Sequence, residues 1–334
     1  MSTSSYNGKT CVVTGANGFV GSHLVDALAK AGANVKALVR QTSDLSLLEG
    51  VESTLVYGDV SERDSLEAAF DGADYVFHVA GVVKALNNDT FDTVNRGGCE
   101  NVCEAILTSA PKLERLVLVS SLAAGGPTTR GHARTEDEPD EPVSIYGHSK
   151  LAGEKLTLEY ADRIPLTVGR PPFVYGPGDS ASFEIFAALK KHFKVIITGG
   201  PRLYSFVYVR DLCDCLMVLG SHERAVNEVF YTCSSEVLSY KELQDEVQRH
   251  LGTWAIYTPM PAFLMPMAGN IADWMARRKG KAAVFSRQKV AEALPEAWVC
   301  SPEKAKRLLG FETKMEIPEG FRIQTEWYRE HGWI

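Results

Sequence analysis

The amino-acid sequence predicts an α/β protein, in which a doubly wound parallel sheet is followed by a smaller mixed lobe. Short apolar segments rich in β-branched residues alternate with segments of helical periodicity between residues 10 and 170. A glycine-rich turn joins the first apolar segment to the first helical one. The alternation becomes irregular afterwards, so we divide the chain into residues 1–178 and a C-terminal lobe of residues 179–334. Some elements of this lobe are expected to return to the main sheet.

Length, charge and cysteine content narrow the class of protein. The 334 residues are 45% hydrophobic, which is enough for a large core, and the net charge of -7 does not suit a nucleic-acid partner. No apolar run reaches the roughly 18 residues of a membrane span, and residues 1–9 do not resemble a signal peptide. The seven cysteines have no metal-ligand spacing. We therefore expect a cytoplasmic protein with reduced thiols, no metal and no membrane span.

The first predicted strand and helix enclose three glycines at three-residue intervals. Residues 10–24 read TCVVTGANGFVGSHL, with Gly15, Gly18 and Gly21 between the apolar strand and the helix. A helix N-terminus offers free N–H groups to a phosphate, and glycines let a pyrophosphate approach the backbone. The spacing is G-x-x-G-x-x-G, whereas the usual fingerprint is G-x-G-x-x-G. This stretch predicts a dinucleotide-binding domain of the Rossmann type, although an ordinary tight turn would have a similar pattern.

The second predicted strand, residues 34–40, ends on a basic residue. In a mononucleotide-binding unit this end lies near the adenosine ribose, where an acid would bind the 2′-hydroxyl. Here the residue is Arg40, and a guanidinium can pair with a 2′-phosphate. Arg40 therefore favours NADP(H), while NAD(H) stays possible if Arg40 is only a solvated loop charge.

Strands and helices continue to alternate in the remainder of the first domain. His78 lies inside one of these strands and is interpreted as a packed core residue. Residues 87–90 and 123–142 are predicted to be loops. We expect strands at 54–57, 75–79, 116–121 and 166–170, and helices at 61–70, 91–109 and 146–162.

Three polar residues form the candidate catalytic group. Tyr146 and Lys150 are four residues apart, so a helix places them on one face. A phenol has a pKa near 10, and a nearby cation should lower it enough for general acid–base catalysis. Ser121 ends a predicted strand and could donate a hydrogen bond to the substrate oxygen.

The C-terminal lobe contains one unusual segment. Residues 259–281 are rich in Met, apolar at first and then basic. They could pack as a cap on the lobe or rest on a membrane surface, and their prolines argue against one long interfacial helix. Elsewhere in the lobe we expect helices at 182–191, from 211 and at 240–251, with strands at 195–198, 205–209 and 229–232.

These motifs, taken in order, resemble the extended short-chain dehydrogenase/reductase family, which includes the NAD-dependent epimerases and dehydratases. The resemblance implies that Ser121, Tyr146 and Lys150 form the catalytic triad, and that Asn95 supports the active-site backbone. It also implies a homodimer formed through helices 91–109 and 146–162. The motifs and the resemblance together predict cofactor contacts at Gly15, Asn17, Gly18, Phe19, Val20, Gly21, Arg40, Asp59, Val60, Ala80, Gly81, Ser120, Tyr146, Lys150, Pro171, Phe173 and Val174.

The stretch RPPFVYGPGD at 170–179 resembles the 3β-hydroxysteroid dehydrogenase and dihydroflavonol reductase branch, because it lacks the Asn typical of sugar-nucleotide enzymes. The first hypothesis is an NADP(H)-dependent oxidoreductase that interconverts a secondary alcohol and a ketone or aldehyde on an apolar small molecule. Such a molecule could contact Phe183, Phe186, Tyr204 and Phe206, unless these residues form only the lobe core.

Two alternatives stay open. A nucleotide-sugar epimerase or dehydratase would bind a diphosphate, with Arg202 and Arg210 as candidates. A non-catalytic NADP(H)-binding regulator is the more remote one, since such relatives tend to lose the Tyr and Lys that this chain keeps.

Overall fold

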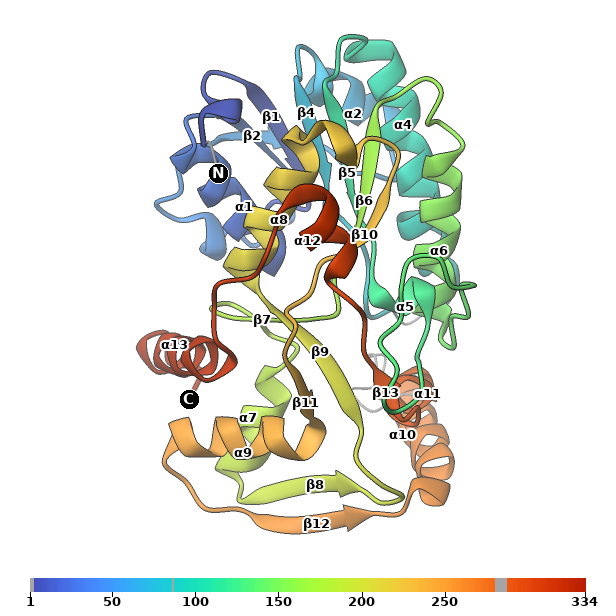
Figure 1. Cartoon of the computed structure of the whole chain (residues 1–334), viewed down its shortest axis with the longest axis vertical. Coiled ribbons are helices and arrows are strands. Elements are labelled where there is room, and N and C mark those ends of the chain that lie inside the picture. Colours follow the sequence, from blue (N-terminus) through green and yellow to red (C-terminus); the bar gives the residue numbers. More distant parts are fainter. Residues whose placement is uncertain (1–2, 86, 280–286) are drawn as a thin grey trace.

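A parallel sheet with the strand order β10-β6-β5-β4-β1-β2-β3 forms the centre of the upper domain in Figure 1. The computed structural model describes residues 3–85, 87–279 and 287–334. The sheet confirms the predicted fold class, and its order reverses between β1 and β4, where a crevice opens at the carboxyl ends of the strands. Its strands are β1 (Thr10–Thr14), β2 (Asn34–Val39), β3 (Thr54–Tyr57), β4 (Tyr75–His78), β5 (Arg115–Val119), β6 (Leu166–Arg170) and β10 (Val229–Tyr231).

Helices cover both faces of this sheet, because successive strand residues point to opposite sides. Val13 packs under one set of helices and Val12 under the other, and both side chains are fully buried. The first face is covered by α1 (Phe19–Lys30), α8 (Val209–Ser221) and α12 (Glu303–Leu309), and the second by α2 (Arg63–Phe70), α4 (Gly98–Ser109) and α6 (Ile145–Leu158). Elements from beyond residue 178, namely α8, β10 and α12, thus belong to the three layers of the upper domain.

The structure differs from the prediction over residues 87–109. Instead of a loop and one regular helix, the chain forms α3 (Asp89–Phe91), the π-helical segment η3 (Asp92–Gly97) and α4. Asn95 lies within η3, and its buried side chain bonds both backbone polar groups of Val82. We attribute the wider turn to these contacts, since π-bulges frequently occur where a helix serves a functional site.

Residues 123–142 were predicted to be a surface loop, and this was only partly right. The segment starts in the short helix α5 (Leu122–Gly125). It then forms isolated bridges between Thr128 and Ala297 and between Arg134 and Cys300, and the Arg134 side chain is buried. A sequence pattern could not show these partners, because they are more than 160 residues away along the chain.

The C-terminal lobe lies below the sheet in Figure 1 and has its own core of aromatic residues. The strand order β11-β9-β13, with β7 beside β9, forms one small sheet, and β12 pairs with β8. The lobe comprises β7 (Phe173–Tyr175), α7 (Phe183–Lys190), β8 (Phe193–Ile197), β9 (Leu203–Tyr208), β11 (Val237–Ser239), α9 (Tyr240–Leu251), β12 (Ile256–Met260), β13 (Ala297–Trp298) and α13 (Ile317–Glu330).

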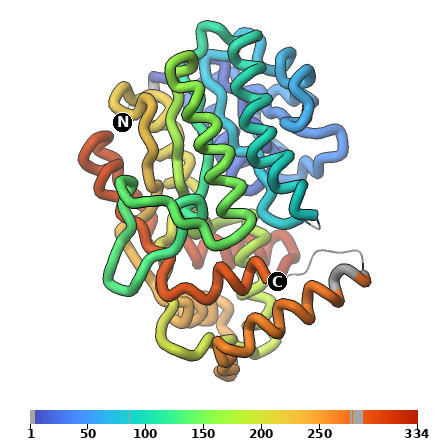
Figure 2. The backbone as a smooth tube through the Cα atoms, turned by 90° about the vertical axis from the view of Figure 1, so that its right-hand side faces the viewer, coloured from blue at the N-terminus to red at the C-terminus, as the bar shows by residue number. Residues whose placement is uncertain are grey.

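The Met-rich segment forms η5 (Ala262–Leu264) and the helix α10 (Met265–Lys279) along the side of the lobe, followed by α11 (Arg287–Ala293) (Figure 2). Residues 280 and 281 of the predicted segment lie outside the described residues. Among the helices that are described, none is long and apolar enough to cross a membrane. All seven cysteines are buried and unbridged.

Candidate active site

A cleft of about 1380 Å³ lies between the carboxyl ends of the central strands and the C-terminal lobe. It collects residues that were predicted separately from seven segments spread over about 160 positions. The roles of these residues stay predictions, but their placement in one cleft is a property of the fold. The lining includes Gly15, Asn17, Gly18, Phe19, Val20, Gly21, Arg40, Asp59, Val60, Ala80, Gly81, Ser120, Ser121, Tyr146, Lys150, Pro171, Phe173 and Val174.

The glycine turn forms a cradle that has no room for side chains. Gly15 has a φ of +65°, which favours glycine, and a Cβ on it would lie 2.8 Å from the Cα of Ala80. A Cβ on Gly21 would collide with the carbonyl oxygen of Gly15. Helix α1 begins directly after Gly18, which provides no side-chain cap, and its first turn contains no acidic residue. The first backbone N–H groups of α1 therefore have no side-chain partner, and the residues that carry them line the cleft. Such a helix N-terminus favours an anion, and the cradle fits a dinucleotide pyrophosphate.

The two residues predicted to contact the adenosine half follow β2 and β3. Arg40 comes directly after β2, and its exposed side chain lines the cleft. Asp59 follows β3, and one of its carboxylate oxygens accepts hydrogen bonds from the backbone N–H and the hydroxyl of Ser61. Asp59 thus braces the turn before α2 while it lines the cleft, so the structural and binding interpretations are compatible.

Tyr146, Ser121 and Lys150 meet where β5 ends and α6 begins. A hydrogen bond joins Tyr146 to Ser121, whose Oγ also accepts from the backbone N–H of Ala123 at 3.1 Å. The buried Lys150 donates from its Nζ to the carbonyl oxygen of Val119 at 2.7 Å. Ser144 caps α6 and thereby determines where this helix starts, because its Oγ accepts from the N–H of Gly147 at 3.0 Å.

The pKa of Tyr146 shifts in the opposite direction to the prediction. Burial raises it to about 12, and the hydrogen bond from Ser121 only partly opposes this effect. Burial also lowers the pKa of Lys150, whose ammonium group is directed to Val119. The carboxylate of Glu292 also raises the pKa of Tyr146, so desolvation and this negative charge act in the same direction. With its pKa raised, the phenol of Tyr146 is protonated at neutral pH in this structure.

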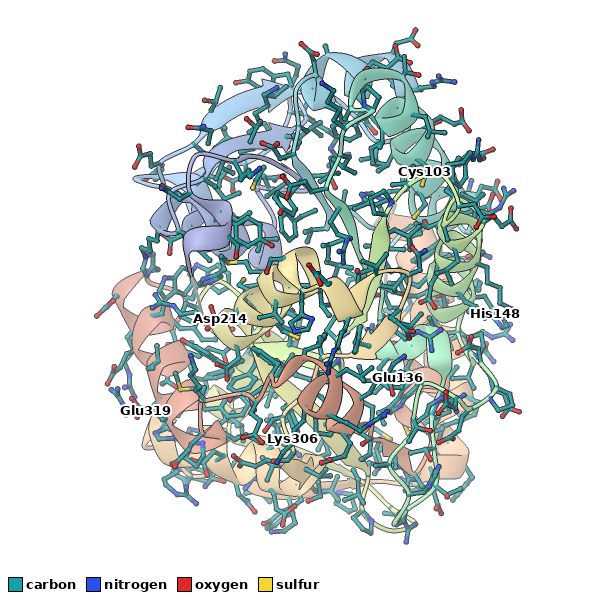
Figure 3. All side chains as sticks on the ribbon, turned by 45° about the horizontal axis from the view of Figure 1, so that its top comes forward. Cys103, Glu136, His148, Asp214, Lys306 and Glu319 are labelled. Carbon is teal, nitrogen blue, oxygen red and sulfur yellow. The ribbon has the colours of Figure 1, made fainter. Side chains whose placement is uncertain are left out.

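Asn95 and Ser149 connect the loop after β4 to α6. The Oδ1 of Asn95 accepts from the N–H of Val82 at 2.8 Å, and its Nδ2 donates to the Oγ of Ser149 at 2.8 Å. Sequence analysis missed Ser149, which lies between Tyr146 and Lys150 and carries no motif signal of its own. The adjacent His148 is exposed on the outside of α6 and plays no part in the cleft (Figure 3).

The part of the cleft beyond the catalytic group is mostly apolar. Pocket and lobe-core roles were both open for four aromatic residues, and three of them, Phe183, Phe186 and Phe206, pack in the lobe core and do not line the cleft. Tyr204 does line it. Sequence analysis missed most of this wall, because its residues come from lobe elements without a recognisable motif. The apolar wall consists of Ile185, Val195, Ile197, Tyr204, Tyr240, Met260 and Met265.

The remaining candidates lie outside the cleft. Arg202 is buried and donates to the carbonyl oxygen of Gly200, Arg210 is exposed, and neither contributes to the cleft lining. His78 bonds Thr14 at 2.8 Å inside the sheet, and burial lowers its pKa to about 3. Within the described ranges no cluster of His, Cys, Asp and Glu could hold a metal ion.

The doubly wound sheet and its glycine cradle define the class of dinucleotide-binding proteins. Residues 11–231 match the model of the NAD dependent epimerase/dehydratase family. The chain therefore belongs to this family of extended short-chain dehydrogenases/reductases, and it is an NAD(P)-dependent oxidoreductase.

One curated relative and two solved structures illustrate which known proteins are similar to this chain. Ceramide reductase of Caulobacter vibrioides is 30% identical over 96% of this chain and 95% of that protein. The crystal structure of gox2253 has a TM-score of 0.80 at 24% identity, covering 97% of this chain and 99% of the other. MoeE5, solved in complex with UDP-glucose and NAD, has a TM-score of 0.76 at 25% identity, covering 96% and 99%.

Proposed function

We propose that this protein is an NADP(H)-dependent oxidoreductase that interconverts a secondary alcohol and a ketone on an apolar small molecule. The observation that carries the proposal is the apolar wall beside Tyr146, which comprises aliphatic, methionine and tyrosine side chains. Such a wall suits a hydrocarbon chain or ring, whereas a sugar requires several polar partners. The similarity to ceramide reductase supports a substrate with long alkyl chains and the reductive direction.

In the proposed reaction, the chain supplies binding groups and one proton. The glycine cradle would hold the pyrophosphate, and Lys150 and residues 171–174 would hold the nicotinamide half. When bound, the nicotinamide supplies the hydride for reduction or accepts it in oxidation. Tyr146 donates its phenolic proton to the substrate oxygen, and Ser121 stabilises that oxygen by a hydrogen bond as negative charge develops.

Cofactor release and substrate screening together test this proposal. One sample of the purified protein is denatured, and any released nucleotide is identified by mass spectrometry. With native protein, the oxidation of NADPH is followed in the presence of long-chain ketones. Turnover of UDP-glucose is measured in a separate assay. We expect little retained nucleotide, and consumption of NADPH with the ketones only. Stoichiometric retained NAD⁺ together with turnover of UDP-glucose would contradict the proposal and support the epimerase alternative, to which the UDP-glucose complex of MoeE5 points.

The preference for NADP(H) is proposed from Arg40. Replacing Arg40 by Asp removes a charge-assisted partner of the 2′-phosphate and adds repulsion, so NADPH binding should weaken about 10- to 100-fold. NADH binding should change by less than about threefold, since the 2′-hydroxyl carries no charge. Titration of both nucleotides by fluorescence gives the two dissociation constants. Arg224→Asp, an exposed site outside the cleft, is the control, and equal losses for both nucleotides would refute this role.

A further inference from the structure

The outer face of η5 and α10 is a continuous apolar stripe, which we call the lobe stripe. It consists of Phe263, Met267, Ile271, Trp274 and Met275, whose exposed fractions are 79%, 57%, 52%, 55% and 46%. Their spacing of four, four, three and one places them on one side of a helix. A helix on a protein surface normally exposes its polar face to solvent. In η5 and α10 an apolar face is exposed instead.

Packing holds α10 in this orientation. On its inner side Met265 is 2% exposed, and a Cβ on Gly269 would lie 2.9 Å from the side chain of Val290 in α11. The backbone N–H of Arg287 donates to Asp273 at 3.0 Å and joins the two helices. Gly269 therefore lies on the side of α10 that packs against α11. The lobe stripe is therefore left exposed by a well-packed arrangement.

The sequence that contains the end of the lobe stripe and continues into α11 is rich in basic residues. Residues 274–291 contain six basic residues and no acidic ones, although the whole chain has a net charge of -7. The guanidinium of Arg278 lies 3.9 Å from the ring centroid of Trp274, and Arg287 is exposed at the start of α11. The six basic residues are Arg277, Arg278, Lys279, Lys281, Arg287 and Lys289.

We propose that the lobe stripe docks on an anionic lipid bilayer, with α10 lying in the plane of the membrane surface. An exposed apolar face that contains a Trp, next to a cluster of four to eight basic residues, matches the two forces that hold interfacial helices on such membranes. Met260 and Met265, at the two ends of the connection into α10, line the cleft, so the docked surface is continuous with the cleft wall. The inference rests on this surface alone and does not require the proposed reaction.

Vesicle flotation tests the docking. The full-length protein is mixed with vesicles of phosphatidylcholine alone, or of phosphatidylcholine with one-third phosphatidylglycerol, and the bound fraction is measured at low and high salt. We expect binding to the anionic vesicles to be about tenfold stronger than to the neutral ones, and to weaken as salt increases. The double variant Ile271→Glu, Trp274→Glu should lose about tenfold or more of this binding, because both side chains then stay out of the apolar layer.

Leu55→Glu is the matched control, since Leu55 is an exposed apolar residue (39%) on β3, a strand of the upper domain. It should leave flotation unchanged, and nucleotide binding should be intact in both proteins because neither change touches the cradle. Equal flotation of the wild type and the double variant would overturn the proposal. The proposal would also be overturned if the wild type did not bind vesicles but formed a dimer that the double variant could not form. That result would assign the lobe stripe to contact with a second copy of the chain. Neither result would bear on the ketone reductase assay, which is performed without vesicles.

Discussion

Replacing Tyr146 by Phe is expected to lower kcat by about 10²–10⁴-fold, which is the usual contribution of a general acid. The variant keeps the ring that packs against the small core at the cleft, and loses only the hydroxyl that bonds Ser121. Dissociation constants for NADPH should change by less than about twofold, since the cradle and Lys150 are untouched. Stopped-flow reduction of the ketone found by screening gives kcat, and fluorescence titration gives nucleotide binding.

Tyr160→Phe is the appropriate control for this loss of turnover. Tyr160 follows the end of α6, bonds Glu104 at 2.6 Å, and does not line the cleft, so its phenol is outside the proposed chemistry. Its removal should leave kcat within about twofold of the wild type. If Tyr146→Phe kept more than about a tenth of the wild-type kcat, another proton donor would have to be sought.

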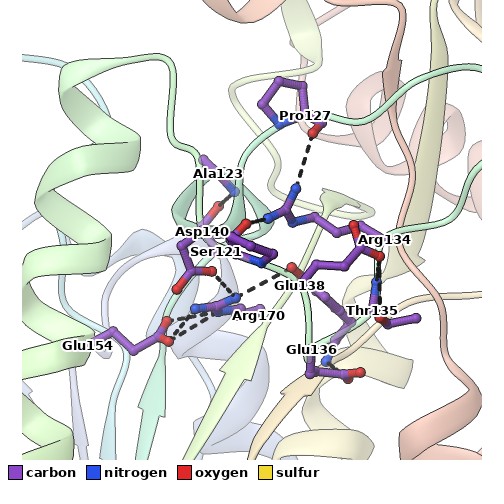
Figure 4. A network of polar contacts seen from close by, with 12 residues as sticks. Ser121, Ala123, Pro127, Arg134, Thr135, Glu136, Glu138, Asp140, Glu154 and Arg170 are labelled. Atoms are coloured by element: carbon purple, nitrogen blue, oxygen red, sulfur yellow. Dashed lines mark hydrogen bonds and ion pairs between the residues drawn. The ribbon is translucent and has the colours of Figure 1, made fainter.

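Replacing Arg170 by Met is expected to destabilise the fold by about 3–5 kcal/mol, because it leaves a buried carboxylate without a partner. Arg170 and Glu154 are 4% and 2% exposed, and their contact is bidentate, with Nε–Oε2 and Nη2–Oε1 distances of 3.0 and 2.5 Å. Asp140 accepts from the same guanidinium at 2.7 Å (Figure 4). Burial opposes the charge, yet these hydrogen bonds raise the pKa of Arg170 above its ordinary value.

This ion pair also anchors the catalytic helix, since Glu154 lies one turn beyond Lys150 on α6 while Arg170 ends β6. Urea unfolding followed by circular dichroism measures the loss. The double variant Arg170→Met, Glu154→Met should recover much of the stability, because the buried carboxylate is removed and Asp140, which is 21% exposed, can be solvated. Arg322→Met, which breaks an exposed pair with Glu319, should leave the stability almost unchanged. A cost for Arg170→Met as small as that of Arg322→Met would show that Glu154 is satisfied without its partner.

The buried parallel strands and the glycine cradle could be predicted from the sequence, because both depend on local patterns. In a run such as Cys11-Val12-Val13, consecutive residues are apolar, so both faces of the strand are apolar. This pattern is typical of a parallel strand that is covered by helices on both faces. Gly15 and Gly21 stand where a side chain would collide with the adjacent backbone, so their positions reveal a close approach. The four-residue spacing of Tyr146 and Lys150 likewise requires only a helix to bring them together.

Only the tertiary structure determined the chemical environment and the far wall of the cleft. The pKa of Tyr146 depends on how many groups exclude water from it, and spacing along a helix does not contain that information. Phe186 and Tyr204 look alike as aromatic residues of one lobe, yet the first fills the lobe core and the second lines the cleft, because strand register and helix rotation decide which way each side chain points. The apolar face of α10 is exposed for the same reason: the contact at Gly269 leaves α11 on one side of the helix and the lobe stripe on the other.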